Sequence, residues 1–276
     1  METGENKKIQ KIVAKSYNEL FFERYHLSIE ISKTNLSYCI LNIDNFHYES
    51  FFNSKINENN ISEILKSEGL LENRFFSKSV LFSGFPNTLI PKSILEDNSE
   101  ERIFRLNHGN AKNLFCESLK NLSIENITAI PSDLTKNIEE LFPDIFLKTR
   151  SSFLIDYLFD INNNELKIFI CNQETGFEII IFKDKKLILQ NIFNCNTIDD
   201  KIYYILFCLQ TIDASLEKIT VQLFGNANDK KFTNLLSNYI PNISLLNRSN
   251  KLYLSSEFDK ITTNRFFSLF SQILCV

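Results

Sequence analysis

The feature of this sequence that most constrains its fold is a repeated order of elements. Three segments with strand-like alternation begin at Leu27, and a helix-like segment, a fourth strand and Gly84 follow them. The same order begins again at Leu166 and reaches Gly225. Matching segments stay about 140 positions apart, and a constant spacing indicates two copies of one structural unit. A chain of 276 residues is long enough for two lobes of ordinary domain size.

The first copy is interrupted. Its three alternating segments are residues 27–32, 36–43 and 46–52. Connections of hairpin length join them, so they predict an antiparallel meander. A helix is expected over 60–69 and a buried strand over 79–82. We interpret the polar, irregular residues 85–122 as an insertion. The copy then resumes with a strand over 124–130 and a helix over 131–142.

The second copy is continuous. Its predicted strands are residues 166–171, 177–182, 187–193, 219–224 and 243–246, and its predicted helices cover 197–209, 232–240 and 266–274. The strand over 177–182 is almost wholly apolar, which is typical of a sheet that is covered on both faces. The helix that Thr197 caps is apolar nearly all round, so we expect it to be sandwiched between other elements.

A meander followed by helix, strand, helix, strand and helix needs right-handed crossovers. That order is the ribonuclease-H-like unit. We therefore predict an α/β fold: a tandem duplication of a βββαβαβα unit, as in actin-like ATPases, with mixed five-stranded sheets and helices on both faces. The expected domains are an N-terminal helical extension (1–24), a first lobe (25–148) with its insertion near 85–122, and a second lobe (149–276).

Charge and apolar patterning exclude several classes of function. A net charge of −4 argues against a nucleic-acid-binding protein, which needs a concentrated basic face. The longest fully apolar run, residues 202–209, is too short to cross a bilayer, and lysines interrupt the N-terminal segment where a signal peptide would lie. Six cysteines form no CxxC pair and three histidines are scattered. We expect reduced thiols, no metal site, and a cytoplasmic protein that binds neither nucleic acid nor membranes.

Several stretches carry a family resemblance: LSIEISKTNLSYCIL near the start, FPNTLIPKSIL in the centre, and KLILQNIFNCNTIDDKIYYILFCLQ followed by ITVQLFG. From about Tyr25 to Cys275, the chain resembles a bacterial family of unknown function within the actin-like ATPase superfamily. The resemblance implies a duplicated ribonuclease-H-like fold more firmly than it implies an activity.

Active members of that superfamily hold nucleotide between their lobes. Their first hairpin carries an Asp-x-Gly-Ser/Thr pattern, in which the Asp engages the divalent metal and the Gly lets backbone amides approach phosphate. The corresponding residues here are Glu30, Ile31, Ser32 and Lys33. The carboxylate is one carbon longer, the glycine is replaced, and a lysine stands at the hydroxyl position.

The other two nucleotide loops also depart from the pattern. The second hairpin should supply a carboxylate and several glycines before a threonine, but residues 170–174 read ICNQE, and only Thr175 agrees. Side chains therefore fill space that a phosphate needs. The adenosine loop should begin with two glycines, and here Asn226 follows Gly225.

We therefore expect a catalytically silent protein, a pseudoenzyme without cofactor or catalytic residues, that acts as a binding or scaffolding module. Its expected partner is another protein, bound at the inter-lobe cleft or the insertion. The alternative is a residual nucleotide-binding protein or weak ATPase or phosphotransferase, with Glu30 as ligand of magnesium in Mg·ATP. Its weak candidate binding residues are Glu30, Ser32, Lys33, Thr175, Gly225 and Asn226. A third hypothesis is a homodimer that associates through the C-terminal helix.

Overall fold

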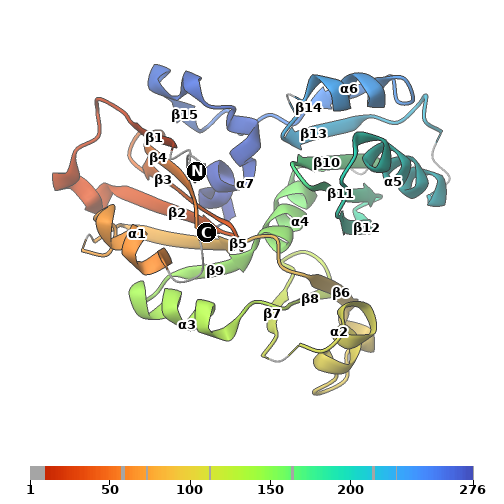
Figure 1. The fold of residues 1–276 in the computed structure, drawn as a ribbon, viewed down its shortest axis with the longest axis horizontal. Coiled ribbons are helices and arrows are strands. Elements are labelled where there is room, and N and C mark those ends of the chain that lie inside the picture. Colours follow the sequence, from red (N-terminus) through yellow and green to blue (C-terminus); the bar gives the residue numbers. More distant parts are fainter. Residues whose placement is uncertain are drawn as a thin grey trace, which may run out of the picture. The chain divides into compact units, whose positions relative to one another are not determined.

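The computed structural model describes residues 10–56, 60–72, 74–111, 113–162, 165–212, 215–227 and 229–275. The chain forms two compact units, whose elements Figure 1 labels. The first unit comprises residues 1–156, 250–260 and 268–276, and the second comprises residues 157–249 and 261–267. The chain first passes from one unit to the other inside helix α4 (Arg150–Asp160).

The first unit is built on a mixed sheet in the order β1-β4-β3-β2-β5-β9, with β15 pairing with β4. Its strands are β1 (Gln10–Val13), β2 (Tyr25–Ile31), β3 (Asn35–Asn42), β4 (His47–Lys55), β5 (Ser77–Phe82), β9 (Phe146–Thr149) and β15 (Tyr253–Leu254). The meander β2-β3-β4 is antiparallel, as predicted, whereas β5 and β9 continue the sheet in parallel. The sheet has more than the predicted five strands because β1 and β15 both pair with β4.

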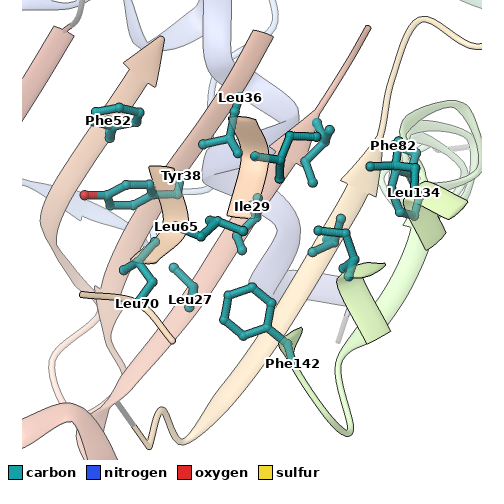
Figure 2. Packing of buried hydrophobic residues seen from close by; sticks show 14 of the residues in the cluster. Leu27, Ile29, Leu36, Tyr38, Phe52, Leu65, Leu70, Phe82, Leu134 and Phe142 are labelled. Carbon is teal, nitrogen blue, oxygen red and sulfur yellow. The ribbon is translucent and has the colours of Figure 1, made fainter. Parts of the chain in front are cut away.

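Helices α1 (Ile61–Ser67) and α3 (Ser132–Leu141) cover one face of this sheet. Figure 2 shows the resulting core, in which Leu27, Ile29 and Tyr38 lie near Leu65 of α1 and Phe142 after α3. Alternate residues of a strand point to one face, so the period-two pattern of β2 and β3 fixes which side chains enter this core.

The insertion forms a small antiparallel sheet in the order β6-β8-β7, made of β6 (Asn87–Pro91), β7 (Phe115–Ser118) and β8 (Ile124–Thr128). The 3₁₀ turn η3 (Lys92–Ile94) and helix α2 (Glu100–His108) lie between β6 and β7 in the chain. The prediction that residues 124–130 return to the main sheet was wrong. β8 has its backbone partners in β6 and β7, and β9 takes the fifth position instead.

The second unit has the predicted five-stranded sheet, in the order β12-β11-β10-β13-β14. Its strands are β10 (Lys167–Gln173), β11 (Gly176–Lys183), β12 (Lys186–Phe193), β13 (Val221–Gly225) and β14 (Ile243–Leu245). This order matches β4-β3-β2-β5-β9 strand by strand. Helices α5 (Ile198–Thr211) and α6 (Lys230–Ser237) pack on one face (Figure 1). Phe182 on the other face contacts Phe159 of α4, so both faces are covered, as expected for β11.

Helix α5 differs from the prediction in one respect. Thr197 caps it as expected, because its hydroxyl accepts from the Asp200 N–H at 3.1 Å. However, the helix is not sandwiched: Tyr203 is 62% exposed and Phe207 is 52% exposed. Only the side that carries residues such as Ile202 and Ile205 enters the core.

The N-terminal helical extension was also predicted wrongly. Residues 10–13 form β1, which pairs antiparallel with β4, and residues 19–24 form the 3₁₀ segment η1 (Glu19–Arg24). The unpaired edge of β4 explains the difference, because it offers backbone hydrogen bonds that override the helical spacing of the apolar residues. The part of this prediction that falls on residues 1–9 lies outside the described residues.

Most of the C-terminal segment belongs to the first unit, whereas the sequence predicted that all of it lies in the second. The first unit contains η4 (Ser256–Lys260), α7 (Phe267–Ser271) from residue 268 onward, and η6 (Gln272–Cys275). The 3₁₀ turn η5 (Thr263–Phe266) belongs to the second unit. Gln272 donates to the Ile29 carbonyl at 3.0 Å and accepts from the Ser79 hydroxyl at 2.7 Å. These polar contacts with β2 and β5 fix the segment on the first sheet.

Two further findings concern thiols and membranes. All six cysteines are free, and four of them are buried. Among the described helices, none has the length and apolar character that crossing a membrane requires.

Candidate functional site

The hairpin between β2 and β3 is closed by its own serine. The Ser32 hydroxyl accepts from the N–H of Asn35 at 2.9 Å and from the N–H of Thr34 at 3.3 Å. These are the backbone donors that a phosphate hairpin would turn toward a ligand. Here the side chain that replaces glycine occupies both of them.

Glu30 lies on β2 and is half-buried. Its carboxylate accepts a hydrogen bond from the Ser268 hydroxyl at 2.6 Å. Ser268 belongs to α7, in the same unit. The residue that replaces the metal-engaging Asp therefore helps to hold the C-terminal segment on the sheet.

Lys33 is exposed at the tip of the same hairpin, where its ammonium lies 5.8 Å from the centre of the Phe85 ring. A cation over a ring at an exposed site contributes about 0.5–1 kcal/mol. Lys33 therefore contacts a residue of its own unit.

In the second unit, Lys201, which belongs to no predicted motif, holds the hairpin between β10 and β11. Lys201 of α5 is only 5% exposed. Its ammonium donates to the Asn172 side-chain oxygen at 2.8 Å and to the Gln173 carbonyl at 2.6 Å. Burial lowers the pKa of Lys201, and the nearby Asp229 carboxylate opposes that shift. The sequence signal that could have indicated this role is the position of Lys201 beside Ile202, on the apolar side of the helix.

The tip of this hairpin is engaged by a second cation. The Arg265 guanidinium pairs with Glu174 at 2.6 Å, and both side chains are largely exposed. Thr175 is exposed, and its carbonyl accepts from the Cys195 N–H at 3.4 Å. The one carboxylate of this hairpin thus has a partner from its own unit.

Gly225 and Asn226 lie against the end of β10. The Asn226 N–H donates to the Asn172 carbonyl at 2.7 Å, and the Asn172 amide donates back to the Asn226 carbonyl at 3.0 Å. Gly225 has a φ of +73°, and a Cβ added there would lie 2.4 Å from the Asn172 carbonyl oxygen. A tight strand-to-helix turn therefore explains this glycine without a ligand.

The six candidate residues thus fall into two groups. Glu30, Ser32 and Lys33 share one hairpin of the first unit, whereas Thr175, Gly225 and Asn226 belong to the second unit. In the second group, Asn172 and Lys201 join the hairpin to the Gly225 turn. No group of three or more potential metal-ligating side chains occurs in the described part of the chain.

The strand order and these hairpins define an α/β protein with the actin-like ATPase fold. A protein of that fold and of unknown function from Bacteroides thetaiotaomicron superposes with a TM-score of 0.74 at 22% identity, over 83% of this chain and 93% of that one. The chain belongs to the family described as "Protein of unknown function (DUF3822)", which matches residues 15–243.

A second solved structure, described as a PilM-PilN type IV pilus biogenesis complex, is similar at a TM-score of 0.56 and 11% identity. It aligns with 90% of this chain and 96% of that one. At these identities the similarity concerns the fold alone. No curated protein gives a significant match.

Proposed function

We propose that this protein is a catalytically silent actin-like module that binds or scaffolds another protein. The observation that carries the proposal is that groups at its phosphate-hairpin positions are bonded to their own unit. The Ser32 hydroxyl accepts hydrogen bonds from backbone amides of its own hairpin, and the Glu30 carboxylate accepts one from Ser268. The Lys201 ammonium donates to Asn172 and Gln173. The matching strand orders of the two sheets support origin of the fold by internal duplication.

These internal contacts oppose nucleotide binding because they use groups that a nucleotide would need. A polyphosphate needs several backbone N–H groups that point at it, and its cation needs carboxylate ligands. Replacing each internal contact with a ligand contact would first leave a buried or half-buried partner without its hydrogen bond. Each such loss costs about 1–3 kcal/mol. The net gain from binding nucleotide is reduced accordingly.

The insertion is the partner surface that we favour. It carries a hollow of about 280 Å³ lined by Asn98, Glu101, Arg102, Arg105, Asn110 and Ala111. Two large apolar side chains of this segment, Ile94 and Leu106, are 63% and 80% exposed. Exposed apolar groups among arginines are a composition common in protein–protein interfaces.

A titration with ATP and magnesium tests catalytic silence. A nucleotide present at about 100 times its Kd would raise the free energy of unfolding by about 2.7 kcal/mol. We expect no such stabilisation and no heat of binding by calorimetry. Glu30→Gln keeps the shape of the side chain and should behave like the wild type in both measurements.

The alternative, a residual nucleotide-binding protein with Glu30 as metal ligand, predicts the opposite pair of results. The wild type would be stabilised by Mg·ATP, and Glu30→Gln would lose that effect. If Mg·ATP binds and stabilises the wild type with micromolar affinity, the proposal that the protein is catalytically silent is refuted, whichever residue binds the nucleotide.

A further inference from the structure

The second unit leaves one long strand edge without a partner. β12 pairs with β11 on one side, and no described strand pairs with its other side. It has eight residues, against three in β14 at the opposite edge. Ile188 is 44% exposed, and the Ile192 N–H donates to the side chain of its neighbour Asn191 at 2.9 Å. A long apolar edge of this kind is a template for a further strand.

An exposed aromatic patch on α5 adjoins this edge. We define it as Tyr203, Tyr204 and Phe207 of α5 together with half-buried Phe193 of β12. Phe193, the last residue of β12, stacks on Tyr204 with ring centres 5.0 Å apart. Tyr203 contacts Tyr204 at 5.2 Å and Phe207 at 6.4 Å. Contiguous exposed apolar surface usually marks an interaction site.

Opposite charges flank β12. The last residue of β11, the turn that follows it and the first residue of β12 carry Lys183, Lys185 and Lys186, all exposed. The first turn of α5, shortly after the strand ends, carries Asp199 and Asp200, also exposed. None of the ion pairs among the described residues involves these side chains.

We propose that β12 and the aromatic patch form a homodimer interface, in which β12 of a second copy pairs antiparallel with β12. In an antiparallel pair, the start of each strand lies beside the end of the other. The lysines before β12 of one copy would therefore approach the aspartates of α5 in its partner. This charge complementarity within one surface identifies a second copy as the occupant.

The same symmetry accounts for the aromatic patch. The twofold axis of an antiparallel strand pair is perpendicular to the sheet, so both α5 helices lie on the same face of the joined sheet. Because the patch adjoins Phe193 at the end of β12, the patch of each copy lies beside the start of β12 in its partner. One rotation thus covers the strand edge, buries the aromatic rings and pairs the charges. The dimer goes beyond the proposed function and does not depend on whether the chain binds nucleotide.

Sedimentation equilibrium of the full-length chain tests the proposal. We expect a species of twice the monomer mass of 32.2 kDa. Tyr203→Glu with Phe207→Glu should give a monomer with an unchanged circular dichroism spectrum. Tyr239→Glu is the matched control, because Tyr239 is 48% exposed but lies outside the patch. It should leave the dimer intact.

Charge reversal tests the orientation of the two copies. Lys185→Glu with Lys186→Glu, and separately Asp199→Lys with Asp200→Lys, should each weaken the dimer about tenfold or more, equivalent to about 1.4 kcal/mol. The chain that carries all four changes should dimerise again. A mixture of the two double variants should form mixed dimers, and high salt should reduce these differences.

A wild-type chain that stays monomeric at high concentration would overturn the dimer, and so would a dimer insensitive to both sets of changes. A monomer that captures a strand of another protein on β12 would also overturn it. Each result is separable from the proposed function, because the Mg·ATP titration can be performed on the monomeric variant. If the wild type is a monomer and binds no ATP, only the homodimer proposal is refuted. If it is a dimer and binds ATP, only the proposal of a catalytically silent protein is refuted.

Discussion

Gly84 and Gly225, the glycines that end the repeated strand order, have nearly the same backbone and different surroundings. Their φ angles are +72° and +73°. Nothing lies within 4 Å of a Cβ added at Gly84, whereas the Asn172 carbonyl oxygen lies 2.4 Å from one added at Gly225. The sequence pattern is therefore the same at both positions, but only the second glycine is required by close packing.

Alanine substitution should separate these two effects. Gly84→Ala meets only the left-handed backbone penalty, so we expect a loss of about 1–2 kcal/mol. Gly225→Ala adds a clash with the backbone of β10, so we expect a loss of about 3 kcal/mol or more. Chemical denaturation of both variants measures the difference. Equal losses would show that the contact with Asn172 does not constrain Gly225.

His26 is a second residue whose surroundings decide its behaviour. It is fully buried, and its ring nitrogens lie 2.7 Å from the Ser77 hydroxyl and 3.0 Å from the Ser79 hydroxyl. Burial lowers the pKa of His26 from 6.5 to about 4. Because the unfolded chain then binds the proton more tightly, stability should fall as the pH drops from about 6.5 toward 4.

The expected loss across that range is about 3 kcal/mol. His26→Gln should remove this part of the pH dependence, while exposed His108→Gln should keep it. The measurement is the free energy of unfolding from urea titrations at several pH values. An identical pH profile in His26→Gln and the wild type would contradict the assignment.

At the scale of elements, the C-terminal segment is held by side chains more than by regular helix. Helix α7 has only five residues and is flanked by 3₁₀ turns, yet Leu269 and Phe270 are fully buried. Gln272 links β2 to β5 through the Ile29 carbonyl and the Ser79 hydroxyl. Leu269 and Phe270 are therefore core residues of the first unit, and a dimer through the C-terminal helix stays a prediction.

Gln272→Ala should therefore destabilise the first unit selectively. It leaves the Ile29 carbonyl without its donor and removes the acceptor of Ser79, at an expected cost of about 2–3 kcal/mol. Hydrogen exchange should show lost protection in β2 and β5 but not in β10 and β13. Leu274→Ala in the same 3₁₀ turn, where the side chain is 38% exposed, is the control. Similar losses in both units would refute this assignment.

At the scale of the whole molecule, the first unit is assembled from three stretches of chain that are distant in sequence. Strand β15 returns to it after residues 157–249 of the second unit, and residues 268–275 return to it after residues 261–267 of the second unit. Apolar periodicity located the C-terminal segment, but it carries no information about which of two similar sheets that segment covers. Long-range hydrogen bonds from Ser268 and Gln272 made that choice.

The sequence alone determined the elements whose signals are local. Alternation located the meander strands, spacing located α3, α5 and α6, and missing glycines and carboxylates indicated the degenerate hairpins. Tertiary structure alone decided which strands share a sheet, that β1 is not a helix, and that Lys201 holds a hairpin. It also decided that one side of α5 stays exposed. Periodicity depends on residues that are close in the sequence. Strand pairing, burial and the partners of charged side chains depend on residues that the chain brings together only when it folds.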